Sequence, residues 1–424
     1  MTTPPPHGQT ATRAGPQSPA TNDAAVGRTT CCIVGAGPAG AMLALLLARQ
    51  GVRVTLLEAH HDFDREFRGD SIHPGVMELL DDLGLADGLL QLPHSKVGQL
   101  QIPGLTGMIT AVDLRRITRR FPYITFLPQA RFLDYITEHA RRYPGFELVM
   151  GAHVDELIVE DGTVRGVRYR AGGARHEVRA LLTVGADGRG SRVRRLAGIE
   201  PIKTSPPMDI LWFRLPRQPG DTDQTFGRFG PGQVLAVINR LDYWQLGYVI
   251  PKGTYQQLRA RGLDALHRDL AELVPELADR FDTLTNWRQV ALLAVESSRV
   301  RQWWRRGLLL IGDAAHVMSP VGGVGINYAI QDAVVAANVL AEPLRQGRLS
   351  RRHLRAVQRR REIPTRIIQT VQTQIQTRLL APTLAADRPI RIPGWVPWLL
   401  RVPILRDLPP RLIAFGVWPV RARL

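Results

Sequence analysis

Short apolar segments and a glycine-rich turn divide the first part of the chain into a strand, a helix and a second strand. Residues 31–34 are apolar and run into a turn with three glycines, after which an apolar helix is predicted over residues 42–48. A second apolar strand over residues 52–57 ends at a glutamate. A strand, a glycine turn, a helix and a further strand are the repeating unit of parallel α/β sheets. The pattern therefore predicts a parallel sheet near the start of the chain.

The segments that follow mix helices with short strands. Residues 72–83 have the signature of a helix, with a proline near the start and a glycine after the end. Residues 132–142 also have helical spacing of their apolar positions. Apolar runs over residues 108–114 and 122–127 are plausible strands.

A change from helical to alternating periodicity marks a second structural unit. The segment 157–167 is typical of a hairpin with Asp161-Gly162 at the turn. Residues 209–250 alternate apolar and polar positions and are rich in aromatic side chains, and residues 258–281 have helical spacing. We therefore expect an antiparallel sheet with helices packed on it.

The last part of the chain is predicted to be helical. A buried strand over residues 308–311 leads to a helix that continues to about residue 344. A charged helical stretch over residues 351–380 is expected to be interrupted at Pro364. The tail over residues 393–424 is expected to pack over the protein as a lid or to lie on an acidic membrane surface. The lid is favoured because the prolines of the tail interrupt a continuous amphipathic helix.

Composition limits the class of protein. With 424 residues and 44% hydrophobic side chains, the chain has the size and composition of a globular protein with a large core. Residues 1–28 have few large apolar side chains, so they are expected to form a disordered tail. Neither an export signal nor an apolar run of membrane-spanning length is recognised, so a cytoplasmic protein is expected.

The net charge of +17 raises the question of a nucleic-acid partner. Only three of the 55 basic residues are lysines, a bias that a GC-rich genome explains as readily as a binding surface does. No nucleic-acid motif accompanies the charge. The favoured interpretation is a solvated basic surface with no nucleic-acid partner.

The first glycine turn has the residues of a dinucleotide-binding loop, Gly35-Ala36-Gly37-Pro38-Ala39-Gly40. Gly35 permits a tight turn, Gly37 lets the backbone approach a pyrophosphate, and Gly40 lets the helix pack closely on the strand. The helix N-terminus then offers amides to the anion. Glu58 follows the second strand, where a carboxylate accepts hydrogen bonds from an adenosine ribose. This loop alone does not distinguish FAD from NAD.

Two later motifs point to FAD. Asp187, Gly188, Ser191 and Arg194 follow a short strand over residues 181–184. A further set follows the strand at 308–311, and it comprises Gly312, Asp313, His316, Pro320, Gly322, Gly325 and Asn327. The carboxylate of Asp313 is placed to accept the ribityl hydroxyls of a flavin. The backbone amides of the Gly322–Gly325 loop are placed to face the isoalloxazine and to stabilise its reduced form.

In these motifs the chain resembles the class A flavoprotein monooxygenases, typified by para-hydroxybenzoate hydroxylase. The resemblance covers roughly residues 30–345. It implies that Asp187 lies near the pyrophosphate and the approach path of a nicotinamide. It also implies FAD contacts by Arg68, Gln129 and Arg131, with Pro320 near the isoalloxazine. His316 is expected to be structural rather than catalytic.

The expected fold is an α/β fold in which a Rossmann-type FAD-binding domain is interleaved with a substrate domain built on an antiparallel sheet. The FAD-binding domain is predicted to be discontinuous, with a C-terminal helical segment over residues 346–424 as a possible lid. Its predicted parts are residues 29–104, 128–206 and 296–345, and those of the substrate domain are residues 105–127 and 207–295.

The resemblance implies a monooxygenase that inserts one oxygen atom from O2 into an apolar or aromatic small molecule through a C4a-hydroperoxyflavin. NAD(P)H is the implied transient reductant, since no second glycine fingerprint is present. FAD is expected to bind noncovalently, without a metal, and the flavin rather than a protein side chain carries the chemistry. A monomer or homodimer that tailors a secondary metabolite is expected.

The substrate is predicted to lie over the antiparallel sheet. Candidate lining residues are aromatic, and about half of them are expected to face the pocket: Trp212, Phe213, Phe226, Phe229, Tyr243, Trp244 and Tyr248. Arg214 is a further candidate for pairing with an acidic or phenolate substrate, although a surface position is favoured.

Two alternative functions share these motifs. A flavin-dependent reductase of the geranylgeranyl reductase type needs no oxygen, and a non-redox cyclase uses FAD only to shape its pocket. A halogenase is disfavoured, because its Trp-x-Trp-x-Ile-Pro signature and its catalytic lysine early in the chain are not found.

Overall fold

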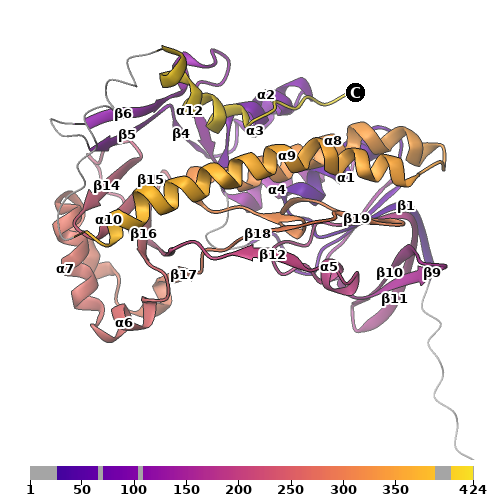
Figure 1. The fold of residues 1–424 in the computed structure, drawn as a ribbon, viewed down its shortest axis with the longest axis horizontal. Helices are drawn as coiled ribbons and strands as arrows, with labels where there is room; N and C mark the ends of the chain where they lie inside the picture. Colours follow the sequence, from indigo (N-terminus) through magenta and orange to yellow (C-terminus); the bar gives the residue numbers. More distant parts are fainter. Residues whose placement is uncertain (1–25, 65–69, 104–107, 387–402, 424) are drawn as a thin grey trace, which may run out of the picture.

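A mainly parallel sheet of eight strands lies on the right side of Figure 1. The computed structural model describes residues 26–64, 70–103, 108–386 and 403–423. Five parallel strands lie in the order β8 (Phe146–Val149), β2 (Val54–Leu57), β1 (Val26–Val34), β11 (Ala174–Gly185) and β20 (Leu308–Leu310). Antiparallel additions to this sheet are β9 (His153–Glu160), β10 (Thr163–Ala171) and β19 (Trp304–Arg305). The predicted α/β fold is confirmed.

The parallel strands end in register. Val34, the last residue of β1, pairs with Leu57 of β2 and with Gly185 of β11. Gly185 in turn pairs with Leu310 at the end of β20. The loops that follow these strands therefore begin along one line at the carboxyl edge of the sheet.

Apolar helices cover the parallel sheet. Helix α1 (Pro38–Arg49) is buried from Ala39 to Ala48, and it packs against α8 (Gly325–Arg345) and α4 (Gln129–Ala140). Helix α9 (Arg351–Ile375) runs beside α8, as Figure 1 shows. These helices and the sheet enclose the largest core of the protein.

The second sheet is antiparallel, as the alternating pattern predicts. Its strands lie in the order β14 (Phe226–Gly230), β15 (Gln233–Asn239), β16 (Tyr243–Pro251), β13 (Met208–Pro216) and β17 (Ala291–Leu293). One face is covered by α6 (Tyr255–Ala260), α7 (Leu263–Leu273) and the 3₁₀ segment η2 (Pro275–Thr283). The other face lines a cavity.

Smaller elements connect the two large sheets. The short strands are β3 (Ser71–Ile72), β4 (Ser95–Val97), β5 (Gln99–Pro103), β6 (Met108–Asp113), β7 (Ile124–Phe126), β12 (Pro201–Thr204), β18 (Ser297–Val300) and β21 (His316–Val317). The short helices are α2 (Pro74–Asp82), α3 (Ala86–Leu89), α5 (Arg192–Leu196), α10 (Ala381–Leu384) and α12 (Pro403–Phe415). The 3₁₀ turns are η1 (Leu114–Arg116), η3 (Trp287–Gln289), η4 (Gly312–Ala314) and η5 (Val321–Gly323), and the π-helical segment is η6 (Gln376–Leu380).

Two expectations about boundaries are wrong. Strand β1 begins at Val26 and pairs with β11, so residues 26–28 do not belong to the predicted tail, whose residues 1–25 lie outside the described part. Helix α9 continues through Pro364 without a break. Pro364 lies on the buried face of α9, whose packing against α8 outweighs the lost hydrogen bond. Helix α12 similarly contains Pro409 and Pro410.

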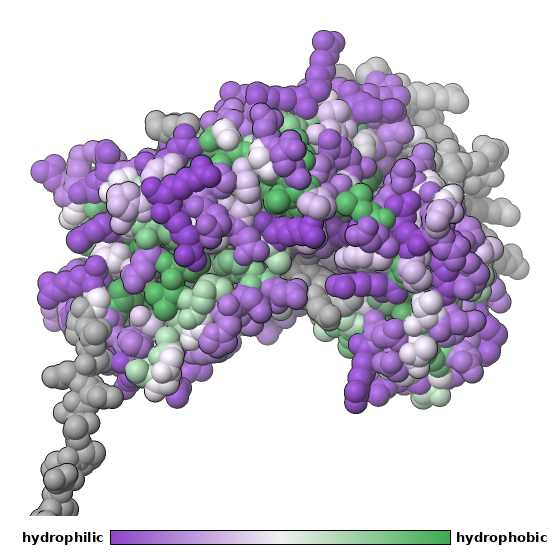
Figure 2. Space-filling model, turned by 180° about the vertical axis from the view of Figure 1, so that it is seen from behind, coloured by the Kyte–Doolittle hydropathy of each residue, from purple (hydrophilic) through white to green (hydrophobic). Residues whose placement is uncertain are grey.

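Among the described residues, one helical segment, Val321–Arg345, is long and apolar enough to cross a membrane, contrary to the expectation that no such run exists. However, 83% of its most apolar window is buried inside the protein. Its apolar side chains pack against α1, α9 and the sheet. The face of the protein shown in Figure 2 is mostly hydrophilic, with hydrophobic residues confined to smaller groups. Val321–Arg345 is therefore a core helix.

A buried ionic network holds α8, α9 and the third motif together. Asp332 of α8 is fully buried and receives hydrogen bonds from His316 Nε2 at 2.6 Å and from Arg361 Nε at 2.7 Å. The backbone N–H of Gly312 donates to the same carboxylate at 3.0 Å. Burial raises the pKa of Asp332, but His316 and Arg361 outweigh burial and hold the pKa below its ordinary value.

Replacing Asp332 with Asn should lower the free energy of unfolding by about 3–5 kcal/mol, because Arg361 loses its counter-ion in a buried position. Urea denaturation measures this loss. E342Q on the same helix is the control, since the pair of Glu342 with Arg345 is exposed to solvent and contributes little to stability. The difference between wild type and D332N should shrink as the pH falls below about 4, because a lowered folded-state pKa stabilises only the ionised form. An unfolding free energy equal to that of wild type at pH 7 would contradict the role of this network.

Candidate functional site

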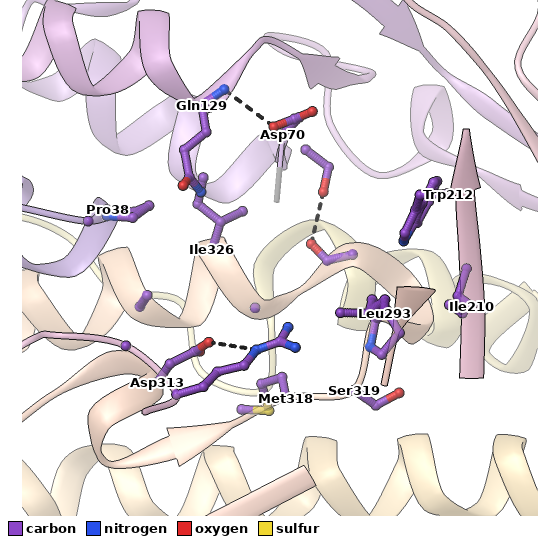
Figure 3. Close-up of a pocket in the computed structure, with 18 of the residues that line it drawn as sticks. Pro38, Asp70, Gln129, Ile210, Trp212, Leu293, Asp313, Met318, Ser319 and Ile326 are labelled. Carbon is purple, nitrogen blue, oxygen red and sulfur yellow. Dashed lines mark hydrogen bonds and ion pairs between the residues drawn. The ribbon is translucent and has the colours of Figure 1, made fainter. Parts of the chain in front are cut away.

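A cavity of about 1430 Å³ lies between the carboxyl edge of the parallel sheet and the open face of the antiparallel sheet. In Figure 3, Pro38 and Asp313 lie on one side of this cavity, and Trp212 and Ile210 lie on the other. The cavity therefore extends from the loops of the glycine motifs to the antiparallel sheet.

The first glycine motif has no room for side chains at two positions. Gly35 has φ +97°, and a Cβ there would lie 2.6 Å from the carbonyl oxygen of Ala186. A Cβ on Gly40 would lie 1.9 Å from the carbonyl oxygen of Gly35. By contrast, a Cβ on Gly37 would meet no atom within 4 Å. The open space at Gly37 lies at the N-terminus of α1, whose first amides have no helical acceptors and suit a phosphate.

Glu58 follows β2 and is 3% exposed, with its side chain in the cavity wall. One oxygen accepts a hydrogen bond from the backbone N–H of Ala36 at 2.8 Å. The other oxygen accepts from the backbone N–H of His60 at 3.1 Å. The Nδ1 atom of His60 also lies 2.7 Å from this second oxygen, so Glu58 fixes the glycine loop to the segment that follows β2.

The second motif is held to the third by side-chain hydrogen bonds. Asp187 lines the cavity and accepts from Ser191 Oγ at 2.5 Å and from the backbone N–H of Val193 at 3.0 Å. Burial raises the pKa of Asp187, and these hydrogen bonds partly offset the effect. Arg194 donates to the carbonyl oxygen of Ala314 at 3.0 Å. The loops after β11 and β20 are thereby joined.

Asp313 presents its carboxylate to the cavity, one-third exposed, with Arg189 Nε at 3.5 Å (Figure 3). Asp313 lies within the η4 turn, which has no side-chain cap hydrogen bond. Gly312 has φ +58°, and a Cβ there would lie 3.1 Å from the Cβ of Ala39. Gly312 therefore lets the Asp313 turn approach the N-terminus of α1.

The Gly322–Gly325 loop forms the next part of the cavity wall, together with Pro320. Gly322 and Gly323 have positive φ angles of 79° and 61°. Asn327 is predicted to contact the cofactor, but it does not line the cavity. Its Nδ2 donates to the carbonyl oxygen of Ser71 at 3.0 Å, and its Oδ1 accepts from the backbone N–H of His73 at 2.8 Å. Asn327 therefore holds the segments beside the loop in position and does not face the cavity.

Other predicted cofactor residues have mixed outcomes. Gly35, Gly37, Ala39, Gln129 and Gly188 line the cavity. Arg131 does not line the cavity and is exposed. It lies two positions after Gln129 in α4, which places the two side chains on nearly opposite sides of the helix. Gly40 and Gly312 act through close packing, and Arg68 lies outside the described residues. His316 belongs to the buried network, as a structural role requires.

The aromatic side chains of the antiparallel sheet are divided between its two faces, because side chains alternate along each strand. Trp212 and Phe226 line the cavity. The prediction is wrong for Phe213 and Tyr248, which are buried in the core beneath α6 and α7, and for Tyr243, which contacts Arg214 outside the cavity wall. Successive side chains of a strand point to opposite faces, so neighbours such as Trp212 and Phe213 do not share one pocket.

Sequence reasoning missed a polar cluster in the cavity wall. Arg240 forms an ion pair with Asp70 and donates from Nε to Gln245 Oε1 at 2.7 Å. The guanidinium lies 5.3 Å from the ring centroid of Phe126. Burial raises the pKa of Asp70, and Arg240 partly opposes the rise. Asp70 and Arg240 are 170 residues apart, so no local pattern connects them.

Comparison with known proteins identifies the family. Residues 28–371 match the family described as FAD binding domain. The chain is 40% identical over 399 residues to 6-methylpretetramide 4-monooxygenase of Streptomyces rimosus, covering 93% of this chain and 94% of that protein. It is 28% identical over 376 residues to rifampicin monooxygenase of Streptomyces venezuelae, covering 84% of this chain and 73% of that protein.

Solved structures share the fold. PqsL, a probable FAD-dependent monooxygenase from Pseudomonas aeruginosa, superimposes with a TM-score of 0.73 at 23% identity, covering 84% of this chain and 98% of that chain. OxyS anhydrotetracycline hydroxylase from Streptomyces rimosus gives 0.71 at 24% identity, covering 94% of this chain and 77% of that chain. The chain belongs to the FAD binding domain family. It is an FAD-dependent monooxygenase that acts on a small molecule with O2, as the resemblance implied.

The cavity fits FAD on its own geometry. The open helix N-terminus at Gly37 suits the pyrophosphate, Glu58 the adenosine ribose and Asp313 the ribityl chain. The cavity beside the Gly322–Gly325 loop has room for the isoalloxazine, and the loop offers backbone amides to it.

Replacing Asp313 with Ala should raise the Kd for FAD about 10- to 100-fold, because a charge-assisted acceptor is lost. Titration of the apoprotein with FAD, followed by quenching of flavin fluorescence, measures the change. D282A is the matched control, since the Asp282 side chain is 96% exposed and does not line the cavity. If D313A retains FAD as tightly as D282A does, the ribityl assignment fails.

Proposed function

We propose that the enzyme hydroxylates a polycyclic phenolic polyketide. The observation that carries this proposal is the 40% identity, over nearly the full length of both chains, to a monooxygenase named for 6-methylpretetramide. The described cavity supports it, because the wall opposite the glycine motifs is broad and largely apolar.

A planar ring system suits this wall. Trp212 on β13 pairs with Gly247 on β16, which pairs with Ala236 on β15. A Cβ on Gly247 would lie 2.8 Å from the indole ring, so the ring of Trp212 lies against the backbone of β16. Two small residues beside a flat indole leave space for a fused aromatic substrate.

Unpartnered polar atoms in the described cavity wall match an oxygenated substrate. Among the described residues that line the cavity, such atoms include Trp212 Nε1, Arg240 Nη1 and His73 Nε2, all buried and without a hydrogen-bond partner. A buried polar group without a partner is unfavourable, so ligand hydroxyl or carbonyl groups would complete these sites. Two of the atoms donate, and Arg240 favours an acidic or enolic oxygen.

The protein's own residues bind, orient and shield the substrate. FAD, when bound, supplies the activation of O2. Trp212 orients the ring system, Arg240 holds an oxygen substituent, and apolar side chains such as Leu114 and Ile413 exclude water. NAD(P)H is proposed as the transient reductant, with Asp187 on its path. The predicted domain division, cytoplasmic location and monomer or homodimer state are part of the same proposal.

The proposal predicts incorporation of oxygen from O2. Incubation of the holoenzyme with NADPH, 6-methylpretetramide and ¹⁸O₂ should yield a product carrying one ¹⁸O atom, whereas H₂¹⁸O with unlabelled O2 should give an unlabelled new hydroxyl. Mass spectrometry of the product measures both.

Two other outcomes would contradict the proposal. Consumption of NADPH with a reduced, unlabelled product would indicate a reductase. A rearranged product formed without NADPH would indicate a cyclase.

A further inference from the structure

His73 lies where the C-terminal helix meets the cavity. It follows β3, caps α2 and is 1% exposed. Its Nδ1 lies 2.7 Å from the carbonyl oxygen of Ile413 in α12. A carbonyl only accepts, so Nδ1 carries the proton and donates. The other ring nitrogen, Nε2, therefore presents a lone pair in the neutral imidazole.

His73 lines the cavity, and its Nε2 is an unused hydrogen-bond acceptor. It is buried from solvent and has no hydrogen-bond partner among the described residues. A Cβ on Gly323 would lie 3.6 Å from it, which places Nε2 beside the glycine loop. Burial lowers the pKa of His73 to about 4, so the imidazole is neutral near pH 7.

The C-terminal helix fixes this tautomer. Helix α12 lies close to α2, where a Cβ on Gly75 would be 3.0 Å from the carbonyl oxygen of Ala414. Gln331 Nε2 of α8 donates to the carbonyl oxygen of Phe415 at 3.3 Å. The Ile413 carbonyl is therefore held in place, and with it the donor and acceptor sides of the imidazole.

We propose that Nε2 of His73 accepts a hydrogen bond from a hydroxyl group on the aromatic substrate, and that this bond makes the enzyme select a phenol over its methyl ether. The inference rests on the proposed function and adds the group that selects the substrate. The neighbouring wall is apolar, with Val112, Leu114 and Ile413, so the ring that carries the hydroxyl has a matching surface.

Such a bond would also favour the reaction. A phenol that donates to a neutral imidazole gains electron density at the ring carbons ortho and para to its oxygen, where an electrophilic oxygen donor attacks. The proton stays shared between the phenol oxygen and Nε2, so no further reactant is required.

Two substitutions at His73 separate the two ring nitrogens. H73N retains a donor near the position of Nδ1 for the Ile413 carbonyl but removes the acceptor at Nε2. H73Q places an amide oxygen near the position of Nε2 and should restore acceptance. FAD content and melting temperature show whether each holoenzyme is folded.

Binding of 2-hydroxyanthraquinone and 2-methoxyanthraquinone to the holoenzymes is the test, followed by the absorbance change of bound FAD. Wild type should bind the hydroxyl probe about 3- to 10-fold more tightly than the methoxy probe. H73N should lose this preference with an unchanged Kd for FAD, and H73Q should recover part of it.

The outcomes that overturn the inference are distinct. Equal binding of the two probes by wild type, or binding of neither, removes the proposed selection. A raised Kd for FAD in H73N with the probe preference intact would assign Nε2 to the imide N–H of the flavin. Because probe binding needs no turnover, a failure to incorporate ¹⁸O would overturn the proposed function without altering this result.

A spectroscopic readout does not depend on either variant being stable. In ¹⁵N-histidine-labelled wild type, the Nε2 signal of His73 should move upfield when the hydroxyl probe binds and should stay in place with the methoxy probe. No movement with a bound hydroxyl probe would contradict the hydrogen bond.

Discussion

The site depends on the common register of four parallel strands. Because β2, β1, β11 and β20 end along one line, Glu58, the glycine turn, Asp187 and Asp313 meet although they are far apart in the chain. This arrangement requires α1 to approach β1 so closely that Gly40 has no space for a side chain. The cavity wall includes the N-termini of α1, at Pro38, and of α8, at Gly325. Phosphate and ring binding are thus consequences of one sheet geometry.

The substrate wall follows a different rule, the alternation of side chains along a strand. One face of the antiparallel sheet forms a core with α6 and α7, and the other presents Trp212 beside Gly247 to the cavity. The C-terminal helix contributes Ile413 to the cavity wall. Among the described residues of the cavity wall, Trp212, Arg240 and His73 each carry a buried polar atom without a partner. The antiparallel sheet therefore determines the shape of the substrate wall. The polar groups of this wall come from three separate parts of the chain.

The parallel sheet and the cofactor motifs were predictable because their signals are local. A strand followed by a glycine turn or an aspartate is readable within a few residues, as for Gly35 and Asp313. The sequence does not indicate which face of the antiparallel sheet each side chain lies on. Phe213 and Trp212 are therefore equally good candidates for the pocket from the sequence alone. The Asp70 and Arg240 pair and the contact of His73 with Ile413 depend on distant segments. The predicted interruption at Pro364 is wrong because the packing of α9 outweighs the local tendency of proline to break a helix.

A crystal structure of the FAD-loaded enzyme tests the central claim most directly. We expect electron density for the pyrophosphate at Gly37 and the N-terminus of α1, for the ribityl chain at Asp313, and for the isoalloxazine between the Gly322–Gly325 loop and the antiparallel sheet. Density for FAD away from the carboxyl edge, or a ring with no access to the face that carries Trp212, would contradict it.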